Sequence, residues 1–417
     1  MSIDWPYLTA DIPGVAMTFR AYFEDFLVEE IPAYLPGGSG THVYFTVEKS
    51  GLSTHEAVSR IAAALKRKSG DIGFAGLKDA KAVTRQAFSV EHIEPALIEG
   101  MQVKGLKVLS IGRHTNKLKT GHLKGNRFVL KLRNIEPECE ADLRRCLAIL
   151  EEKGVPNYFG SQRFGMRGDT WKIGRALLKG DFKDAVELIA GIPEDWRNEC
   201  ARRASEAFMR GEYQKAAPLW PAGFREAAKL SWNLVRTQGD MEKAVTRLDK
   251  PMLKFYVSAF QSYLFNDYLA RRMERLDEIL TGDWVVKHSS GALFLAESGE
   301  EQTPRARLFE VSAAGPVFGK KMRKATGEAR CLEEAILEGC GVAEPVFSTR
   351  GLFFCAGDRR ALRFKPAEAS LEKGSDEHGG YYQLCFTLPP GCYATSVLRE
   401  MAKDKLTEGK PRQEQPA

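Results

Sequence analysis

The chain reads GFAGLKDAKAVTRQ at residues 73–86, a segment that places one carboxylate, Asp79, among small residues, cations and hydrogen-bonding side chains. Gly73 and Gly76 allow tight backbone geometry and let a ligand come close to the chain. The cations that flank the acid are Lys78, Lys81 and Arg85. Because nearby cations favour the charged form of a carboxylate, we expect an ionised Asp79 that can act as nucleophile or base. The spacing alone equally allows an Asp that caps a turn or pairs with a surface Lys.

The residues on either side of this loop predict a strand, a helix, the Asp79 loop and a second strand. Apolar residues alternate with others at 43–47, which is the pattern of a half-buried strand. Ser53 and Glu56 then have the spacing of a helix capping box, and apolar residues follow at helical spacing as far as Leu65. After the loop, the short apolar run at 87–90 predicts another strand.

The length of 417 residues exceeds the usual size of a single hydrophobic core and indicates about two to three domains. The hydrophobic content of 43% and the charged content of 28% are those of an ordinary globular protein. No run of about eighteen apolar residues marks a membrane span. The first residues lack the charged and apolar regions of a signal peptide, so we expect a cytoplasmic protein.

The eight cysteines are scattered, with no C-x-x-C pair and no His at the spacing of a zinc site. We therefore expect free thiols and no metal centre. The net charge of +6 is only mildly basic, so a polyanionic partner has to be argued from local clusters of charge.

The most polarised stretch is 113–133, which is rich in Lys and Arg and contains no acidic residue. A strand over 126–133 would turn Asn126, Phe128 and two leucines to one face and mostly cations to the other. Cations attract phosphates whatever the sequence, and an exposed ring offers a stacking platform for an unpaired base, so the pattern suits RNA. The alternative is a solubilising basic hairpin with Phe128 in the core.

Helical periodicity dominates from about residue 165 to about residue 343, which indicates a separate, mainly helical lobe. Pro251 opens a long candidate helix that ends at 271–272. Strand patterns return after Arg359. The last stretch, 403–417, is polar and without periodicity, and we expect it to be disordered.

Four segments resemble the TruD family of tRNA pseudouridine synthases. The loop at 76–79, with the residues that follow it, resembles the family signature and puts Asp79 at the place of the catalytic Asp. Residues 123–128 resemble the family's Lys-Gly-Asn-x-Phe segment, and 157–165 resemble its Asn-Tyr-Phe-Gly-x-Gln-Arg-Phe-Gly segment. Residues 393–400 resemble its carboxy-terminal motif. The segments occur in the order that the family has.

The resemblance implies an α+β fold with a mixed-sheet pseudouridine synthase catalytic domain built from both ends of the chain. We expect its first part at 1–160 and its second part at 344–402. Between them the resemblance implies a mainly helical TRUD domain at 161–343, which agrees with the helical periodicity there. A disordered tail would follow at 403–417.

By resemblance, the reaction is the isomerisation of a specific tRNA uridine, uridine 13 of the D arm in bacterial members, to pseudouridine without a metal or organic cofactor. Asp79 would attack C1′ of the ribose or abstract a ribose proton. Arg20 would keep Asp79 ionised and oriented, Phe128 would stack on the extruded base, and Asn126 would hydrogen-bond near the loop to hold Asp79.

The resemblance implies tRNA as the partner. We also expect no membrane, no obligatory protein partner and a monomer. The candidates for RNA binding are Lys117, Lys119 and Lys124 in the basic stretch, together with Lys78 and Arg163.

Two positions depart from the family pattern. Ala80 follows the catalytic Asp, where the family often has a Lys or Arg, and Lys81 comes one residue later. Arg20 stands where members often have Lys, and Arg is not a neutral replacement at a shaped site. Two other functions stay open from the residues: a non-catalytic RNA-binding protein or RNA chaperone, and a glycosidase-like hydrolase that uses Asp79 and releases uracil.

Overall fold

The computed structural model describes residues 4–192, 196, 198–348 and 351–410. Contacts within the chain divide it into two compact units. Unit 1 consists of Met1–Pro6 and Pro156–Arg363, and unit 2 of Tyr7–Val155 and Phe364–Ala417. Unit 1 therefore extends beyond the expected insert of 161–343 on both sides. The assignment of that insert as a TRUD domain stays a prediction.

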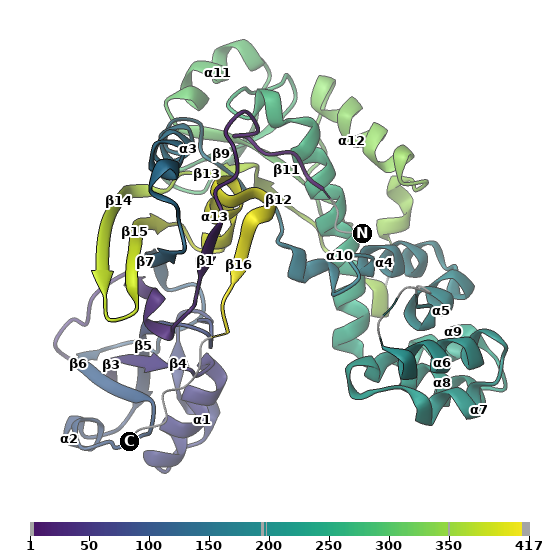
Figure 1. Ribbon diagram of the computed structural model, residues 1–417, viewed down its shortest axis with the longest axis horizontal. Helices are drawn as coiled ribbons and strands as arrows, with labels where there is room; N and C mark the ends of the chain where they lie inside the picture. The colour runs from purple at the N-terminus through teal and green to yellow at the C-terminus, as the bar shows by residue number, and fades with distance from the viewer. Residues whose placement is uncertain (1–3, 193–195, 197, 349–350, 411–417) are drawn as a thin grey trace. The chain divides into compact units, whose positions relative to one another are not determined.

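Unit 2 is built on a mixed sheet that has ten strands in the described residues (Figure 1). Its longest path runs β14-β15-β7-β2-β5-β3-β6, while β1 pairs with β16 and β7, and β4 pairs with β5. The strands are β1 Met17–Phe19, β2 Phe26–Pro32, β3 His42–Ser50, β4 Gly73–Phe74, β5 Val83–Glu91, β6 Leu106–His114, β7 Leu123–Arg133, β14 Ala367–Asp376, β15 Gly379–Leu388 and β16 Leu406–Glu408.

The helices of unit 2 pack on this sheet in two hydrophobic clusters. One cluster joins β2, β7 and β15 to α3 and α13, and the other joins β3 and β5 to α1. The helical segments of this unit are α1 Thr54–Ala64, α2 Pro95–Glu99, α3 Glu140–Lys153 and α13 Ala394–Ala402, with short 3-10 turns η1 Phe23–Asp25, η2 Ser69–Asp71, η3 Pro137–Cys139 and η10 Lys403–Lys405. The mixed α+β class expected from the sequence is confirmed.

The segment around Asp79 forms as the sequence predicts. Strand β3 is followed by α1, whose first turn is closed by the Ser53 and Glu56 capping box. Asp79 then lies in the loop between β4 and β5. Strand β5 runs parallel to β2 and antiparallel to β3, so the end of the loop enters the middle of the sheet.

The expectation of a disordered tail from residue 403 is wrong for its first residues. Residues Lys403–Lys405 form η10, and Leu406–Glu408 form β16, which pairs with β1 in parallel register. Leu406 also packs against the main core cluster. Pairing with a distant strand supplies the order that the local sequence does not indicate. Residues 411–417 lie outside the described part of the chain.

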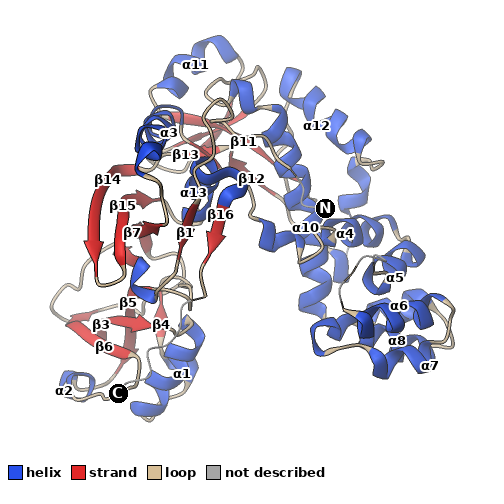
Figure 2. Cartoon of the chain, viewed as in Figure 1, coloured by secondary structure: helices blue, strands red, loops and turns tan. Residues whose placement is uncertain are grey.

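Unit 1 is mainly helical, as the periodicity predicts (Figure 2). It also contains a four-stranded sheet in the order β10-β9-β11-β12. Its helices are α4 Thr170–Lys179, α5 Phe182–Ala190, α6 Glu199–Met209, α7 Tyr213–Ala216, α8 Arg225–Arg236, α9 Met241–Thr246, α10 Lys250–Arg271, α11 Gly299–Arg307 and α12 Gly327–Gly339. Its strands are β9 Trp284–Lys287, β10 Leu293–Leu295, β11 Val311–Val317 and β12 Asp358–Ala361.

The chain passes between the units at β8 Val155–Pro156 and returns at β13 Arg363–Phe364. Across the described residues, no helix has the length and apolar character that crossing a membrane requires.

Candidate active site

The carboxylate of Asp79 is held from two sides and remains partly open to solvent. Its Oδ2 accepts a hydrogen bond from Nη2 of Arg20 at 2.5 Å, and its Oδ1 accepts one from the backbone N–H of Lys81 at 3.2 Å. The Asp79 side chain is 43% exposed, whereas that of Arg20 is 8% exposed. The structure thus brings Arg20 and Asp79 together as the family resemblance implies, with the Asp79 carboxylate partly exposed and the Arg20 guanidinium buried.

Arg20 is fixed by its backbone as well as by its charge. The residue follows β1 with a φ of 56°, in the left-handed region that a non-glycine residue occupies only at a cost of about 1–2 kcal/mol. Its guanidinium lies 4.1 Å from the ring centre of Phe26, a cation–π distance. Its Nε is buried without a hydrogen-bond partner among the described residues. This geometry aims both terminal nitrogens of the guanidinium towards the Asp79 loop and the C-terminal strand.

Glu408, at the end of β16, is a member of this group that the sequence did not predict. Its Oε1 accepts hydrogen bonds from Nη1 of Arg20 and from Nζ of Lys81, each at 3.2 Å. Residues in the polar tail carried no pattern that could have pointed to it.

Lys49 is a second cation that the sequence reasoning missed. Its ammonium donates to the carbonyl oxygen of Leu52 at 2.5 Å and to that of Asp79 at 3.3 Å. Only 1% of Lys49 is exposed, and this burial lowers the pKa of the ammonium from 10.5 to about 8, against the opposing effect of Asp79. One signal was available: Lys49 continues the strand alternation of Val43, Phe45 and Val47, all of which are buried.

Buried polar side chains hold the rest of the loop in place. Nε2 of Gln86 donates to the carbonyl oxygen of Gly76 at 2.5 Å, and Oγ1 of Thr54 accepts from the backbone N–H of Lys78 at 2.8 Å. Thr54 in turn donates to Oε1 of Gln86 at 3.2 Å. A side chain at Gly73 would come within 2.4 Å of the Leu118 carbonyl oxygen, so the close approach at that glycine is to the protein's own chain.

Lys78 has a different place from the one expected of an RNA-binding residue. Its ammonium lies 2.6 Å from Oε2 of Glu30, and the two side chains are 5% and 2% exposed. A buried cation that already has a buried anionic partner is not available to a phosphate. The structure therefore corrects Lys78 to a residue that anchors the loop on β2.

Phe128 and Asn126 lie on the same face of β7, two residues apart. Phe128 is 8% exposed and packs against Phe26 and Phe386, with ring centres 6.1 and 5.5 Å away. The expected exposed ring is thus a core ring in this structure. Asn126 makes no hydrogen bond to the Asp79 loop in the described residues, and its Oδ1 is buried without a partner.

The acid-free stretch 113–133 is only partly a free basic surface. Lys119 and Lys124 are exposed, and Nζ of Lys117 donates to the carbonyl oxygen of Gly70 at 2.6 Å. The strand cations are instead paired with acids of other segments: Arg127 with Glu29, Lys131 with Asp376, and Arg133 with Asp25 and Asp376. The lysines at 117–124, rather than the cations at 127–133, are therefore the ones that remain for phosphates.

Comparison with known proteins places this chain in a family. The family model described as tRNA pseudouridine synthase D (TruD) matches residues 2–401. The chain belongs to the TruD family. TruD proteins are pseudouridine synthases, which are isomerases. The match covers Arg20, Asp79, Asn126 and Phe128 but ends before Glu408.

Individual TruD relatives are similar over nearly their whole length. The tRNA pseudouridine synthase D of Geotalea daltonii is 42% identical over 398 residues, which cover 95% of this chain and 99% of that protein. That of Thermus thermophilus is 38% identical over 406 residues, with 96% and 92% covered. A crystal structure of a Methanosarcina mazei protein assigned to TruD has 29% identity and a TM-score of 0.82, covering 95% of this chain and 96% of that one.

Arg163, the remaining RNA-binding candidate, belongs to unit 1 and to the TruD-like segment 157–165. Its Nη1 donates to Oγ of Ser258 at 3.3 Å, and its guanidinium lies 5.8 Å from the ring centres of Phe159 and Phe255. A guanidinium beside aromatic rings can contact both phosphates and bases. That Arg163 contacts RNA stays a prediction.

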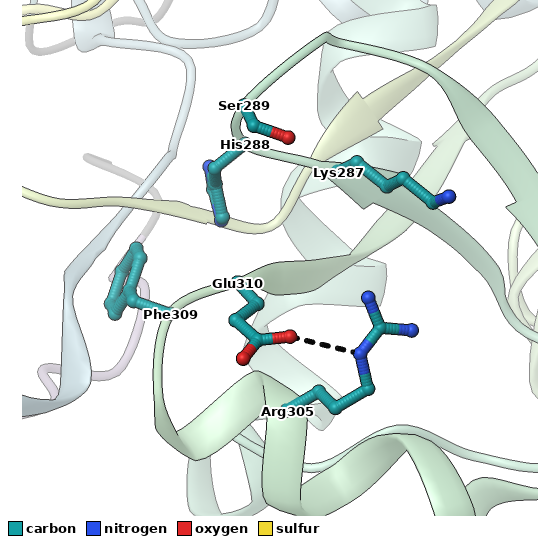
Figure 3. A pocket seen from close by; sticks show the side chains of 6 residues that line it. All are labelled: Lys287, His288, Ser289, Arg305, Phe309 and Glu310. Carbon is teal, nitrogen blue, oxygen red and sulfur yellow. Dashed lines mark hydrogen bonds and ion pairs between the residues drawn. The ribbon is translucent and has the colours of Figure 1, made fainter.

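A separate pocket of about 310 Å³ lies in unit 1 and contains none of the predicted site residues (Figure 3). The residues that line it are Lys287, His288, Ser289, Arg305, Phe309 and Glu310. Its carboxylate, on Glu310, accepts a hydrogen bond from Nε of Arg305 at 3.0 Å. In the part of the chain that the structure describes, no group of three or more His, Cys, Asp and Glu side chains is placed to hold a metal ion.

Proposed function

We propose that this chain converts a uridine of tRNA, uridine 13 of the D arm, to pseudouridine, with Asp79 as the catalytic residue. The observation that carries the proposal is the pair of Arg20 and Asp79: a half-exposed carboxylate held at 2.5 Å by a buried guanidinium, in a chain of the TruD family. A carboxylate that is held by a buried cation and partly exposed to solvent can contact the ribose of a bound RNA.

The reaction balances without a further reactant. The bond between N1 of uracil and C1′ breaks, and a bond between C5 and C1′ forms. C5 loses its hydrogen as a proton, and N1 gains one. Asp79 either attacks C1′ and forms a covalent intermediate, or removes a ribose proton and gives a glycal. In both routes the hydrogen bond from Arg20 holds the carboxylate in one orientation towards the sugar.

Asn126 and Phe128 would contact the extruded base. The buried Oδ1 of Asn126 has no partner in the described residues, which leaves an acceptor for an N–H group of uracil. Phe128 is the proposed stacking ring, and its burial means that neighbouring side chains must move before a base can lie on it. The cost of extruding the uridine, about a few kcal/mol, would be offset by such contacts and by phosphate contacts of Lys117, Lys119 and Lys124.

The remaining parts of the proposal rest on the family and on the expectations drawn from the sequence. The substrate is tRNA, the protein acts in the cytoplasm as a monomer, and the overall isomerisation requires no cofactor.

The test is to map pseudouridine in bulk tRNA by carbodiimide treatment and primer extension in a strain that lacks the gene. We expect the stop at uridine 13 to be absent, to return with the wild-type chain, and to stay absent with Asp79→Asn. A stop at another uridine would overturn the assignment of the target. No stop with the wild-type chain, together with tRNA binding, would indicate an RNA-binding protein; release of free uracil would indicate a hydrolase.

A further inference from the structure

The last strand of unit 2 delivers a carboxylate to the Asp79 loop from the far end of the chain. Strand β16 lies beside β1 (Figure 1). The two strands pair in parallel, with Glu408 opposite Phe19. The backbone N–H of Gly409 donates to the carbonyl oxygen of Phe19 at 2.9 Å. This pairing fixes Glu408 next to Arg20, the residue that follows Phe19.

Glu408 contacts both cations that flank Asp79. Its Oε1 accepts from Nη1 of Arg20 and from Nζ of Lys81, each at 3.2 Å. The other terminal nitrogen of Arg20 donates to Oδ2 of Asp79 at 2.5 Å, and the backbone N–H of Lys81 donates to its Oδ1 at 3.2 Å. Each cation-bearing residue therefore joins the two carboxylates.

The geometry of a guanidinium makes this bridge directional. The group is planar and its donors have fixed positions, so fixing Nη1 on one carboxylate limits where Nη2 can point. The contact with Glu408 supplies such a restraint, because Nε of Arg20 has no hydrogen-bond partner in the described residues. A side chain at Gly409 would come within 2.4 Å of the Arg20 carbonyl oxygen, so the end of β16 also holds the backbone of this turn.

We propose that Glu408 is a positioning residue that orients Arg20 and Lys81 on Asp79, so that the C-terminal strand completes the active site. The proposal rests on the proposed function of Asp79 and goes beyond it by assigning a role to a residue outside the TruD match. Glu408 acts through the two cations and touches no reacting atom. As an anion beside an RNA site, it also weakens phosphate binding slightly.

The variant Glu408→Gln keeps the shape of the side chain and removes its charge. Asp404→Asn is the matched control, because it removes one negative charge from an exposed residue of the same tail. We expect Glu408→Gln to lower the single-turnover rate constant at saturating tRNA about tenfold, with tRNA affinity unchanged or tighter. The control should keep both values. Glu408→Asp should recover part of the rate, because it restores the charge.

A second readout does not depend on activity. Carbodiimide and an amine label carboxylates, and mass spectrometry of the peptide that contains Asp79 measures how readily this group reacts. If Glu408 holds Arg20 on Asp79, labelling of Asp79 should rise severalfold in Glu408→Gln and stay unchanged in Asp404→Asn.

Unchanged labelling and an unchanged rate constant in Glu408→Gln would overturn the proposal. A fall in rate that comes with weaker tRNA binding and a lower unfolding temperature would also overturn it, because this is the result of a purely structural role. Increased labelling of Asp79, in a protein whose wild-type form makes no pseudouridine, would refute the proposed function and still support the positioning role of Glu408.

Discussion

Lys49→Met should change how the stability of unit 2 depends on pH. Lys49 is a buried ammonium, and its burial lowers its pKa from 10.5 to about 8. Below pH 8 the folded protein carries the charged, desolvated group, whereas above pH 10.5 the group is neutral in both the folded and the unfolded state. Between these values the unfolded state binds more protons, so the free energy of unfolding of the wild-type protein rises with pH across this window.

The size of the effect follows from the same two pKa values. The difference between 10.5 and 8 corresponds to about 3 kcal/mol of stability that the wild-type protein lacks at neutral pH. Lys49→Met removes this cost, but it leaves the carbonyl oxygens of Leu52 and Asp79 without this donor, at about 1–3 kcal/mol each. These effects oppose each other at neutral pH. We therefore expect a small difference there and a variant that falls further behind the wild type, by about 3 kcal/mol, towards the top of the window.

The two units can be followed separately during urea unfolding. All six tryptophans lie in unit 1, so their fluorescence reports on unit 1, whereas far-ultraviolet circular dichroism reports on both units. The experiment compares urea unfolding of three proteins, at neutral pH and at about pH 10: the wild type, Lys49→Met and the control Lys124→Met. The control removes an exposed lysine of unit 2. An identical pH dependence of the dichroism transition in the wild type and Lys49→Met would refute the reasoning. A shift confined to the fluorescence transition would do the same.

Two further predictions concern Phe128 in β7 and the three lysines Lys117, Lys119 and Lys124. Phe128→Ala should lower the free energy of unfolding of unit 2 by about 3–5 kcal/mol, because the ring packs against two other phenylalanines; urea unfolding measures this, and a change below about 1 kcal/mol would contradict the core placement. Replacing these three lysines by Ala should weaken the dependence of tRNA binding on salt. The slope of log K against log salt concentration should fall by about 0.7–0.9 for each phosphate that the protein no longer binds. The single-turnover rate constant at saturating tRNA should change little. Arg127→Ala is the matched control, since Glu29 already pairs with that arginine, and an equal reduction of the slope in the control would assign the lysines no special role.

Local patterns in the sequence predicted α1, which precedes the Asp79 loop in unit 2, and the start of α10 in unit 1. The capping box and the apolar spacing after it gave α1, and Pro251 marked the first turn of α10. These signals are local, because helix caps and helical faces depend on residues only a few positions apart. The contact between Arg20 and Asp79, in contrast, was expected from the family resemblance and not from spacing.

The electrostatic prediction for 113–133 was only partly right, because ion pairing crosses strands. Reading along the chain finds no acid within 113–133. The acids that pair with Arg127 and Arg133, Glu29 and Asp25, come from β2 and η1. Antiparallel pairing of β2 with β7 puts Glu29 directly opposite Arg127. The sequence shows how many charged residues lie along a segment. It does not show which of them form ion pairs with residues of neighbouring strands.

Glu408 shows a stricter limit of sequence reasoning. Its bond to Arg20 joins residues that are 388 positions apart, and β16 has three residues, too few to show a period. Lys49, in contrast, could have been predicted from the sequence. Extending the alternating pattern of β3 by two residues beyond Val47 places Lys49 on the buried face.

The central claim is that Asp79 makes pseudouridine, and the most direct measurement follows the hydrogen at C5 of the target uridine. Because the new bond forms at C5, tRNA that carries tritium there must release it to water during the reaction. The account predicts release of one tritium per tRNA by the wild-type chain with uracil retained in the RNA, and none by Asp79→Asn although the variant folds and binds tRNA. Release by Asp79→Asn at the wild-type rate would contradict the account.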